Sequence, residues 1–285
     1  MALKKIGILY HPKVESTRVK AVELESFLKA KGVSAWAGSA WEKEKANEKM
    51  KDTDLLLTVG GDGTILRAVQ AVIPGMAPIT GINLGKLGFM TELDNDEAVK
   101  QLPSLIAGKG WLDERAMLQA ELESKGKKSK VFHALNDVVL ARGAIARLIR
   151  VEVDIDGQTV SSYKADAIIA ATATGSTGYA LAAGGPIMYP QSLDMLLVPV
   201  APHLSLPCPL IVSEKSEVVL RLNTYHEATL SIDGHINLTV VDGDTVTIRK
   251  SPCIARFRRL RPEGAFFSNL EDKLKGKQGE SGRKS

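Results

Sequence analysis

The sequence predicts an α/β protein whose N-terminal α/β domain has a parallel sheet and whose C-terminal domain is a mainly-β sandwich. Three observations support this prediction. Apolar strand-like and amphipathic helix-like segments alternate in the first third, short β-like segments dominate from about residue 111, and a glycine-rich turn at 60–64 joins a strand to a helix.

The sequence of the first third predicts strands that alternate with helices. We expect strands at 5–10, 55–59 and 77–82, and helices at 17–30 and 65–71. Gly32 stands where a glycine commonly ends a helix. Ligands of parallel sheets bind at the carboxyl ends of strands, where residues 60–64 and 83–85 fall.

The later part of the chain is rich in β-type segments. Expected strands lie at 116–123, 130–133, 137–142, 148–155, 157–162, 167–171, 218–222, 228–232 and 244–249. Residues 155–158 resemble a hairpin turn, and the repeat of Ile-Asp-Gly at 155–157 and 232–234 is interpreted as turn chemistry.

These patterns predict four segments. Residues 1–110 form the α/β domain, 111–255 the β domain, 256–272 a segment that returns to the first domain, and 273–285 a disordered basic tail.

Composition limits the function classes. With 285 residues, 44% of them hydrophobic, and a net charge of +4, the chain is expected to be a cytoplasmic globular protein. Its apolar runs are too short to cross a bilayer, and its N-terminus does not resemble a signal peptide. Cys208 and Cys253 fit no zinc pattern, and no nucleic-acid or membrane partner is expected.

The motif Gly60-Gly61-Asp62-Gly63-Thr64 carries the strongest chemical signal. Glycines at a strand-to-helix junction let backbone N–H groups surround a polyphosphate at the positive helix end. A carboxylate there is repulsive unless it binds a metal or takes a proton from an attacking hydroxyl, and either role suggests phosphoryl transfer. A tight turn is the structural alternative. The motif matches neither the P-loop nor the dinucleotide fingerprint.

A second unusual stretch covers residues 171–186. Thr174, Ser176 and Thr177 offer hydroxyl groups, and Tyr179 offers a ring and an O–H, which suits an adenine, a ribose or a phosphate. Taken alone, the stretch is more typical of a loop that caps a helix.

With these motifs in order, the chain resembles the NAD kinases from residue 5 to about residue 275. The matching stretches are 60–64, 83–89, 113–118, 135–137, 142–147, 163–166, 174–179, 183–187 and 256–262. The resemblance implies transfer of the ATP γ-phosphoryl group to the adenosine 2′-hydroxyl of NAD, a homodimer or homotetramer, and Mg²⁺ or another divalent cation.

The resemblance also implies residue roles. Asp62 would be the general base or would position the metal, and no metal ligand is otherwise assigned. The phosphate-binding residues would be Gly60, Gly61, Gly63 and Thr64. The NAD-binding residues would be Asn136, Asp137, Arg147, Asp166, Thr174, Thr177, Gly178 and Tyr179, with Asp166 on the nicotinamide half and a subunit interface as one option.

Some positions depart from the family pattern. They are Ala167, Ala173, Gly178, Ala182, Cys208 and His235. The sequence therefore does not decide whether the phosphoryl acceptor is NAD or NADH, or whether the donor is ATP or polyphosphate. Two other functions stay open: a lipid or sphingoid-base kinase that shares the glycine motif, and a catalytically silent NAD sensor.

Overall fold

The computed structural model describes residues 2–75, 77–85, 88–145, 147–203, 205–268, 270–271 and 273–274. The chain forms two compact units, which we call unit 1 (Met1–Glu114 with Arg256–Ser285) and unit 2 (Arg115–Ala255). The expected ends of the first two segments are residues 110 and 255, and the two units meet after Glu114 and after Ala255.

Unit 1 contains a parallel sheet. Its strands are β1 (Lys5–Tyr10), β2 (Ser34–Ser39), β3 (Leu55–Val59), β4 (Ile79–Asn83), β5 (Leu93–Asp94) and the end of β17 (Thr245–Arg259). Their order is β17–β4–β3–β1–β2, with β5 also beside β4. The chain thus leaves β1 in one direction to form β2 and in the other to form β3, so the C-terminal ends of β1 and β3 flank a topological switch point.

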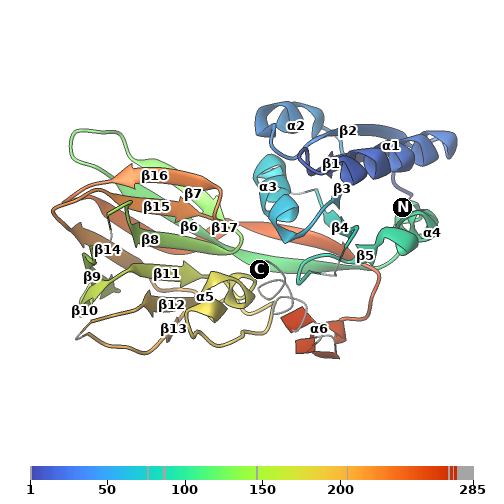
Figure 1. Ribbon diagram of the computed structural model, residues 1–285. Coiled ribbons are helices and arrows are strands. Elements are labelled where there is room, and N and C mark those ends of the chain that lie inside the picture. The colour runs from blue at the N-terminus through green and yellow to red at the C-terminus, as the bar shows by residue number, and fades with distance from the viewer. Residues whose placement is uncertain are drawn as a thin grey trace, which may run out of the picture. The chain divides into compact units, whose positions relative to one another are not determined.

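Helices cover both faces of this sheet (Figure 1). The helices of unit 1 are α1 (Glu15–Ala30), α2 (Lys43–Lys49), α3 (Asp62–Val72), α4 (Asn95–Ile106) and the short α6 (Ala265–Ser268). Leu24 of α1 and Leu102 of α4 share a core with Ile82. On the opposite face, Ile65 of α3 lies against Gly81, where any side chain would collide with it. Side chains alternate along a strand, so α3 packs opposite α1 and α4.

Unit 2 is built from antiparallel strands. One set comprises β6 (Trp111–Glu123), β7 (Lys130–Ala134), β9 (Ile149–Ile155), β10 (Gln158–Ala165), β14 (Val218–Asn223) and most of β17. The other is the sheet β13–β12–β11–β8–β15–β16. Its strands are β8 (Asp137–Arg142), β11 (Ala167–Ala171), β12 (Met195–Val200), β13 (Leu210–Val212), β15 (Ala228–Ile232) and β16 (Ile236–Val240).

The core of unit 2 lies between its two sets of strands. Leu140 of β8, Leu230 of β15, Val151 of β9 and Leu220 of β14 belong to one buried cluster. The predicted sandwich is therefore confirmed, as is the parallel α/β domain. Among the described residues, no helix is long and apolar enough to span a bilayer.

Most expected elements are present, with shifted ends. Helix α3 begins at Asp62 rather than at residue 65, and β17 runs on to Arg259 rather than ending at residue 249. Strand β2 and helix α4 are not among the elements expected from the sequence. Ser34–Ser39 is only partly buried, which weakens its strand pattern. Helix α4 has Ala98, Leu102 and Leu105 at helical spacing, but its internal Pro103 is untypical of a helix.

Candidate functional site

The glycine turn leads directly from β3 into α3. Gly60 has φ +151°, and a Cβ there would lie 2.3 Å from the Thr64 hydroxyl, so glycine is required. Gly61 is the N-cap residue, and no described side chain caps the helix. The first N–H groups and the positive end of the helix dipole are therefore suited to an anion.

A pocket of about 290 Å³ opens beside this turn. It is lined by His11 after β1, Gly60 and Gly61 after β3, and Asn83, Leu84 and Gly85 after β4, together with Val14, Ser16 and Thr17. The pocket thus lies at the switch point of the sheet, where α/β proteins commonly bind ligands. The two glycine-containing segments are predicted from the sequence, whereas His11 is not among the predicted site residues.

Asp62 is held by a neighbouring loop. One carboxylate oxygen accepts a hydrogen bond from Phe89 N at 2.9 Å, and the other accepts one from Met90 N at 3.1 Å. Gly88 lies so close that a Cβ there would be 2.3 Å from Asp62 Oδ1. Each carboxylate oxygen can accept further bonds, so Asp62 is oriented and still able to accept a proton or to bind a cation.

A lysine from the end of the described chain belongs to the same part of unit 1. Lys273 Nζ lies 5.8 Å from the centre of the Phe89 ring. Burial and the positive charge of Arg259 lower the pKa of Lys273, whereas the charge of Asp62 raises it. The predicted tail thus begins with a half-buried residue, and residues 275–285 lie outside the described residues.

In unit 2, the loop after β11 is fastened to the start of β8. Thr172 N donates to Asn136 O at 2.9 Å, and its hydroxyl donates to Leu135 O at 2.5 Å. Gly175 lies against Asn136, where a Cβ would be 2.0 Å from the Asn136 carbonyl oxygen. These contacts bring Asn136 and the 174–179 segment together.

The groups in this cluster suit a polar, aromatic ligand. At Gly178, a Cβ would lie 3.7 Å from Asn136 Nδ2 and 3.9 Å from Asp137 Oδ2. Asn136 Oδ1 is buried without a hydrogen-bond partner among the described residues. Tyr179 begins α5 (Tyr179–Ala182) and is 46% exposed, so its ring is open to stacking. Thr174 and Thr177 are buried, and Thr177 Oγ1 donates to Thr174 O at 3.2 Å.

Asp233 organises this cluster from the β15–β16 turn. Its carboxylate accepts from Leu135 N at 2.9 Å, Asn136 N at 2.7 Å and Asp137 N at 3.1 Å. Burial raises the pKa of Asp233 to about 7 and that of Asp137 to about 6. From the sequence, residues 232–234 are predicted only as a turn, because a contact across about a hundred residues leaves no local signal.

Two predicted NAD-binding residues lie elsewhere. Asp166 precedes β11, whose register pairs Ala167 with Ala141 and Ala171 with Asp137. Asp166 is therefore at the opposite end of this strand pair from the Asn136 cluster, about 17 Å away at 3.3 Å per residue. It pairs with Arg142 Nε at 2.7 Å. Arg147 contacts His226 Nε2 at 2.9 Å. Neither side chain joins the cluster within one chain.

No group of three or more metal-ligating side chains occurs among the described residues. The Asp62 carboxylate is a side chain at the glycine turn that could give an oxygen ligand to a cation. This donor chemistry suits Mg²⁺.

Comparison with known families agrees with both units. Residues 5–110 match the ATP-NAD kinase N-terminal domain, and residues 135–260 match the ATP-NAD kinase C-terminal domain. The chain belongs to the NAD kinase family. It is accordingly an enzyme of the phosphotransferase class.

Members of the NAD kinase family are similar over nearly the whole chain. An NAD kinase of Dehalococcoides mccartyi is 49% identical over 274 residues, which cover 96% of each chain. An NAD kinase of Chloroflexus aggregans is 38% identical, covering 96% of this chain and 99% of that protein.

Solved structures show the same likeness. The yeast NADH kinase complexed with NADH has a TM-score of 0.86 at 28% identity, covering 96% of this chain and 88% of that one. The NAD kinase of Archaeoglobus fulgidus in complex with ATP has a TM-score of 0.76 at 27% identity, covering 95% and 98%.

Proposed function

We propose that the chain transfers the γ-phosphoryl group of ATP to the adenosine 2′-hydroxyl of NAD and so forms NADP. The observation that carries this proposal is the placement of Asp62 at the start of an uncapped helix whose N-cap residue, Gly61, lines a pocket of about 290 Å³. The Archaeoglobus fulgidus relative solved with ATP supports this donor, and the yeast relative solved with NADH supports a dinucleotide acceptor.

Unit 1 supplies the donor chemistry. Gly61 and Gly63 offer backbone N–H groups to the ATP phosphates, and Thr64 offers its hydroxyl. The N–H groups of Gly60 and Thr64 donate to Ile82 O and Gly61 O, so Gly60 contributes by letting the backbone come close to the phosphates. Phosphoryl transfer mainly requires positioning and neutralisation of charge, which the helix N-terminus provides. Asp62 takes the proton of the attacking hydroxyl, a contribution on the order of 100-fold or more.

Unit 2 supplies the acceptor chemistry. Asn136 and Asp137 hydrogen-bond the ribose and adenine of NAD. Asn136 Oδ1, which has no hydrogen-bond partner among the described residues, can accept a hydrogen bond from the nucleoside. Thr174, Thr177, Gly178 and Tyr179 line the adenosine. The match of the chain to both domains of the NAD kinase family favours NAD over a lipid as the acceptor.

A divalent cation, Mg²⁺ by its preference for oxygen ligands, neutralises the phosphate charge when bound. Asp62 would hold it through one carboxylate oxygen while the nucleotide supplies further ligands. The remaining protein contribution is the orientation of that carboxylate by the N–H groups of Phe89 and Met90.

The deciding experiment compares wild type with Asp62→Asn, using NAD, ATP and Mg²⁺ and an NADP-specific dehydrogenase as readout. We expect the variant to lose turnover by at least 100-fold while it still binds NAD. Asp54→Asn is a matched control, because Asp54 also accepts from two backbone N–H groups, those of Lys4 and Lys5, at 2.6 and 2.9 Å.

Asp54→Asn should keep wild-type kcat. An Asp62→Asn variant with near-wild-type turnover would remove Asp62 from the mechanism. If the folded wild type forms no NADP, parallel assays with NADH and with polyphosphate show whether the acceptor or the donor was misassigned. Loss of all three activities, with NAD still bound, would favour a sensor.

A further inference from the structure

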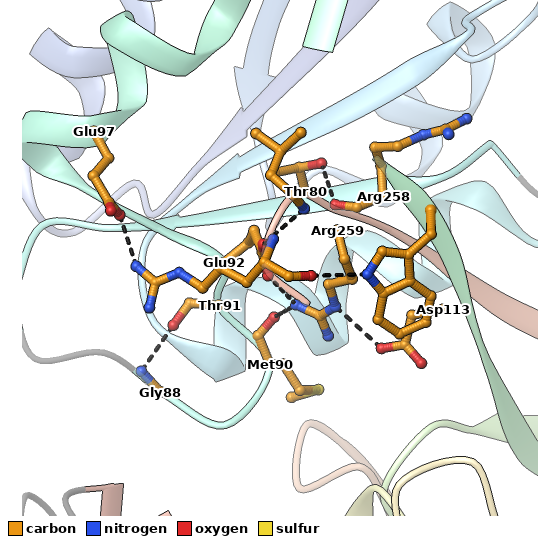
Figure 2. Close-up of polar contacts among 12 residues, drawn as sticks. Thr80, Gly88, Met90, Thr91, Glu92, Glu97, Asp113, Arg258 and Arg259 are labelled. Carbon is orange, nitrogen blue, oxygen red and sulfur yellow. Dashed lines mark hydrogen bonds and ion pairs between the residues drawn. The ribbon is translucent and has the colours of Figure 1, made fainter. Parts of the chain in front are cut away.

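Arg259 is a buried cation at the end of β17. Its side chain is 7% exposed, and it lies between two buried carboxylates, those of Asp113 (2% exposed) and Glu92 (5% exposed). Its Nε donates to Asp113 Oδ2 at 3.1 Å, and its Nη1 lies 3.4 Å from Glu92 Oε2. The shortest of its bonds goes elsewhere: Nη1 donates to the backbone carbonyl of Met90 at 2.7 Å (Figure 2).

The loop at 88–92 is fastened on this side by several bonds (Figure 2). Glu92 Oε1 accepts from Leu260 N at 2.8 Å and from Arg261 N at 2.7 Å. Within the loop, Gly88 N donates to Thr91 Oγ1 at 2.8 Å. The end of β17 therefore holds the loop through both a backbone carbonyl and a side-chain carboxylate.

The opposite side of the same loop faces Asp62. Met90 donates its N–H to Asp62 Oδ1 and accepts Arg259 at its carbonyl, and Phe89 N holds Asp62 Oδ2. The backbone of Met90 thus links the Arg259 guanidinium, bound at the Met90 carbonyl, to the Asp62 carboxylate, bound at the Met90 N–H. The Met90 carbonyl satisfies one donor of the buried guanidinium and at the same time joins Arg259 to the segment that holds Asp62.

We propose that Arg259 is a positioning residue for Asp62, acting through the backbone N–H and carbonyl of Met90. This inference rests on the proposed function, because it concerns the orientation of the carboxylate that accepts the proton. Movement of this carboxylate by about 1 Å can lower the rate on the order of 100-fold without weakening substrate binding. Arg259 therefore affects kcat rather than KM.

The test is Arg259→Lys, which keeps the positive charge but loses the planar fork that reaches Asp113 and Met90 together. Steady-state kinetics with NAD, ATP and Mg²⁺ should show kcat lowered by about 10- to 100-fold, with both KM values within about threefold of wild type. Thermal melting identifies the temperature range in which the variant is folded.

Arg256→Lys is the matched control. Arg256 also lies on β17 and pairs with a β6 carboxylate, Glu114, at 2.9 Å, but its side chain is 37% exposed and makes no described contact with the 88–92 loop. We expect it to keep kcat within about twofold of wild type. A folded Arg259→Lys with wild-type kcat, while Asp62→Asn is inactive, overturns the inference.

A second variant decides the question if Arg259→Lys does not fold. Thr91→Val keeps the shape of a buried side chain and removes the acceptor of Gly88 N–H, so it loosens the loop without touching the ion pairs. A kcat loss of about threefold or more at unchanged KM supports the inference, and wild-type kcat overturns it. An active Asp62→Asn variant would instead show that Asp62 is not the proton acceptor of the proposed function, and this inference would fail with that assignment.

Discussion

Two threonine hydroxyls in unit 1 are buried without a hydrogen-bond partner among the described residues, and they should behave differently. Thr58 lies within β3, whereas Thr64 lies in the first turn of α3, beside the phosphate cradle. A buried hydroxyl without a partner costs free energy, so a hydroxyl that a ligand later pairs has a reason to remain. Thr64 is at the proposed ATP site, and Thr58 is not.

A valine substitution at each position tests whether the hydroxyl binds the nucleotide, because valine keeps the shape of threonine and removes the hydroxyl. We expect Thr64→Val to raise the KM for ATP by about 10-fold or more, as for loss of a hydrogen bond to a charged group. Thr58→Val should leave kinetics within about twofold of wild type and not lower the melting temperature. Equal ATP KM values for the two variants would show that Thr64 Oγ1 does not contact the nucleotide.

The two Ile-Asp-Gly turns of unit 2 are alike in backbone and opposite in electrostatics. Asp156 and Asp233 both have positive φ, at 52° and 49°, and each precedes a glycine. Asp156 is exposed, and hydrogen bonds from Glu217 N and the Ser216 hydroxyl lower its pKa. Burial raises the pKa of Asp233 to about 7, so its folded form holds its proton more tightly than the unfolded chain does.

The stability that each carboxyl contributes should therefore change with pH in opposite directions. For Asp233, the contribution is complete below the ordinary value of 3.8 and is lost as pH rises through about 7. Urea unfolding should show the advantage of wild type over Asp233→Asn shrinking by about 2–4 kcal/mol between pH 4 and pH 8. The advantage over Asp156→Asn should instead shrink as pH falls below the ordinary range of a carboxyl. A parallel trend for both variants would contradict the burial of Asp233.

Elements whose signals are local could be predicted from the sequence, and contacts between distant segments could not. The order strand, Gly60–Gly61, helix is visible because glycine and apolar residues mark it within a few positions. The hairpin turn at Asp156–Gly157 is visible for the same reason. The bond of Arg259 to Met90 joins residues 169 positions apart, and no local pattern marks its acceptor, a backbone carbonyl. Asp233 was likewise recognised as a turn residue but not as the support of Asn136.

At the scale of the whole molecule, the position of Asp166 bears on assembly. Within one chain it lies at the far end of the β8–β11 pair from the Asn136 cluster, and it is 40% exposed beside Arg142. If Asp166 contributes to NAD binding at the cluster, either the dinucleotide spans this distance within one chain or another copy of the chain brings Asp166 to the cluster. The expected homodimer or homotetramer would supply that copy.

Mixing two inactive variants tests this arrangement. Asp62→Asn and Asp166→Asn are each expected to lose activity, and co-refolding distributes them at random among oligomers. If each site takes Asp62 from one subunit and Asp166 from another, one site in four receives both intact residues, so about a quarter of wild-type NADP formation returns. Asp62→Asn mixed with the double variant offers no intact Asp62 and should restore nothing. Recovery would therefore show that a site is completed across subunits. No recovery, from two variants that are each inactive and elute as oligomers in size-exclusion chromatography, would place the role of Asp166 within its own subunit.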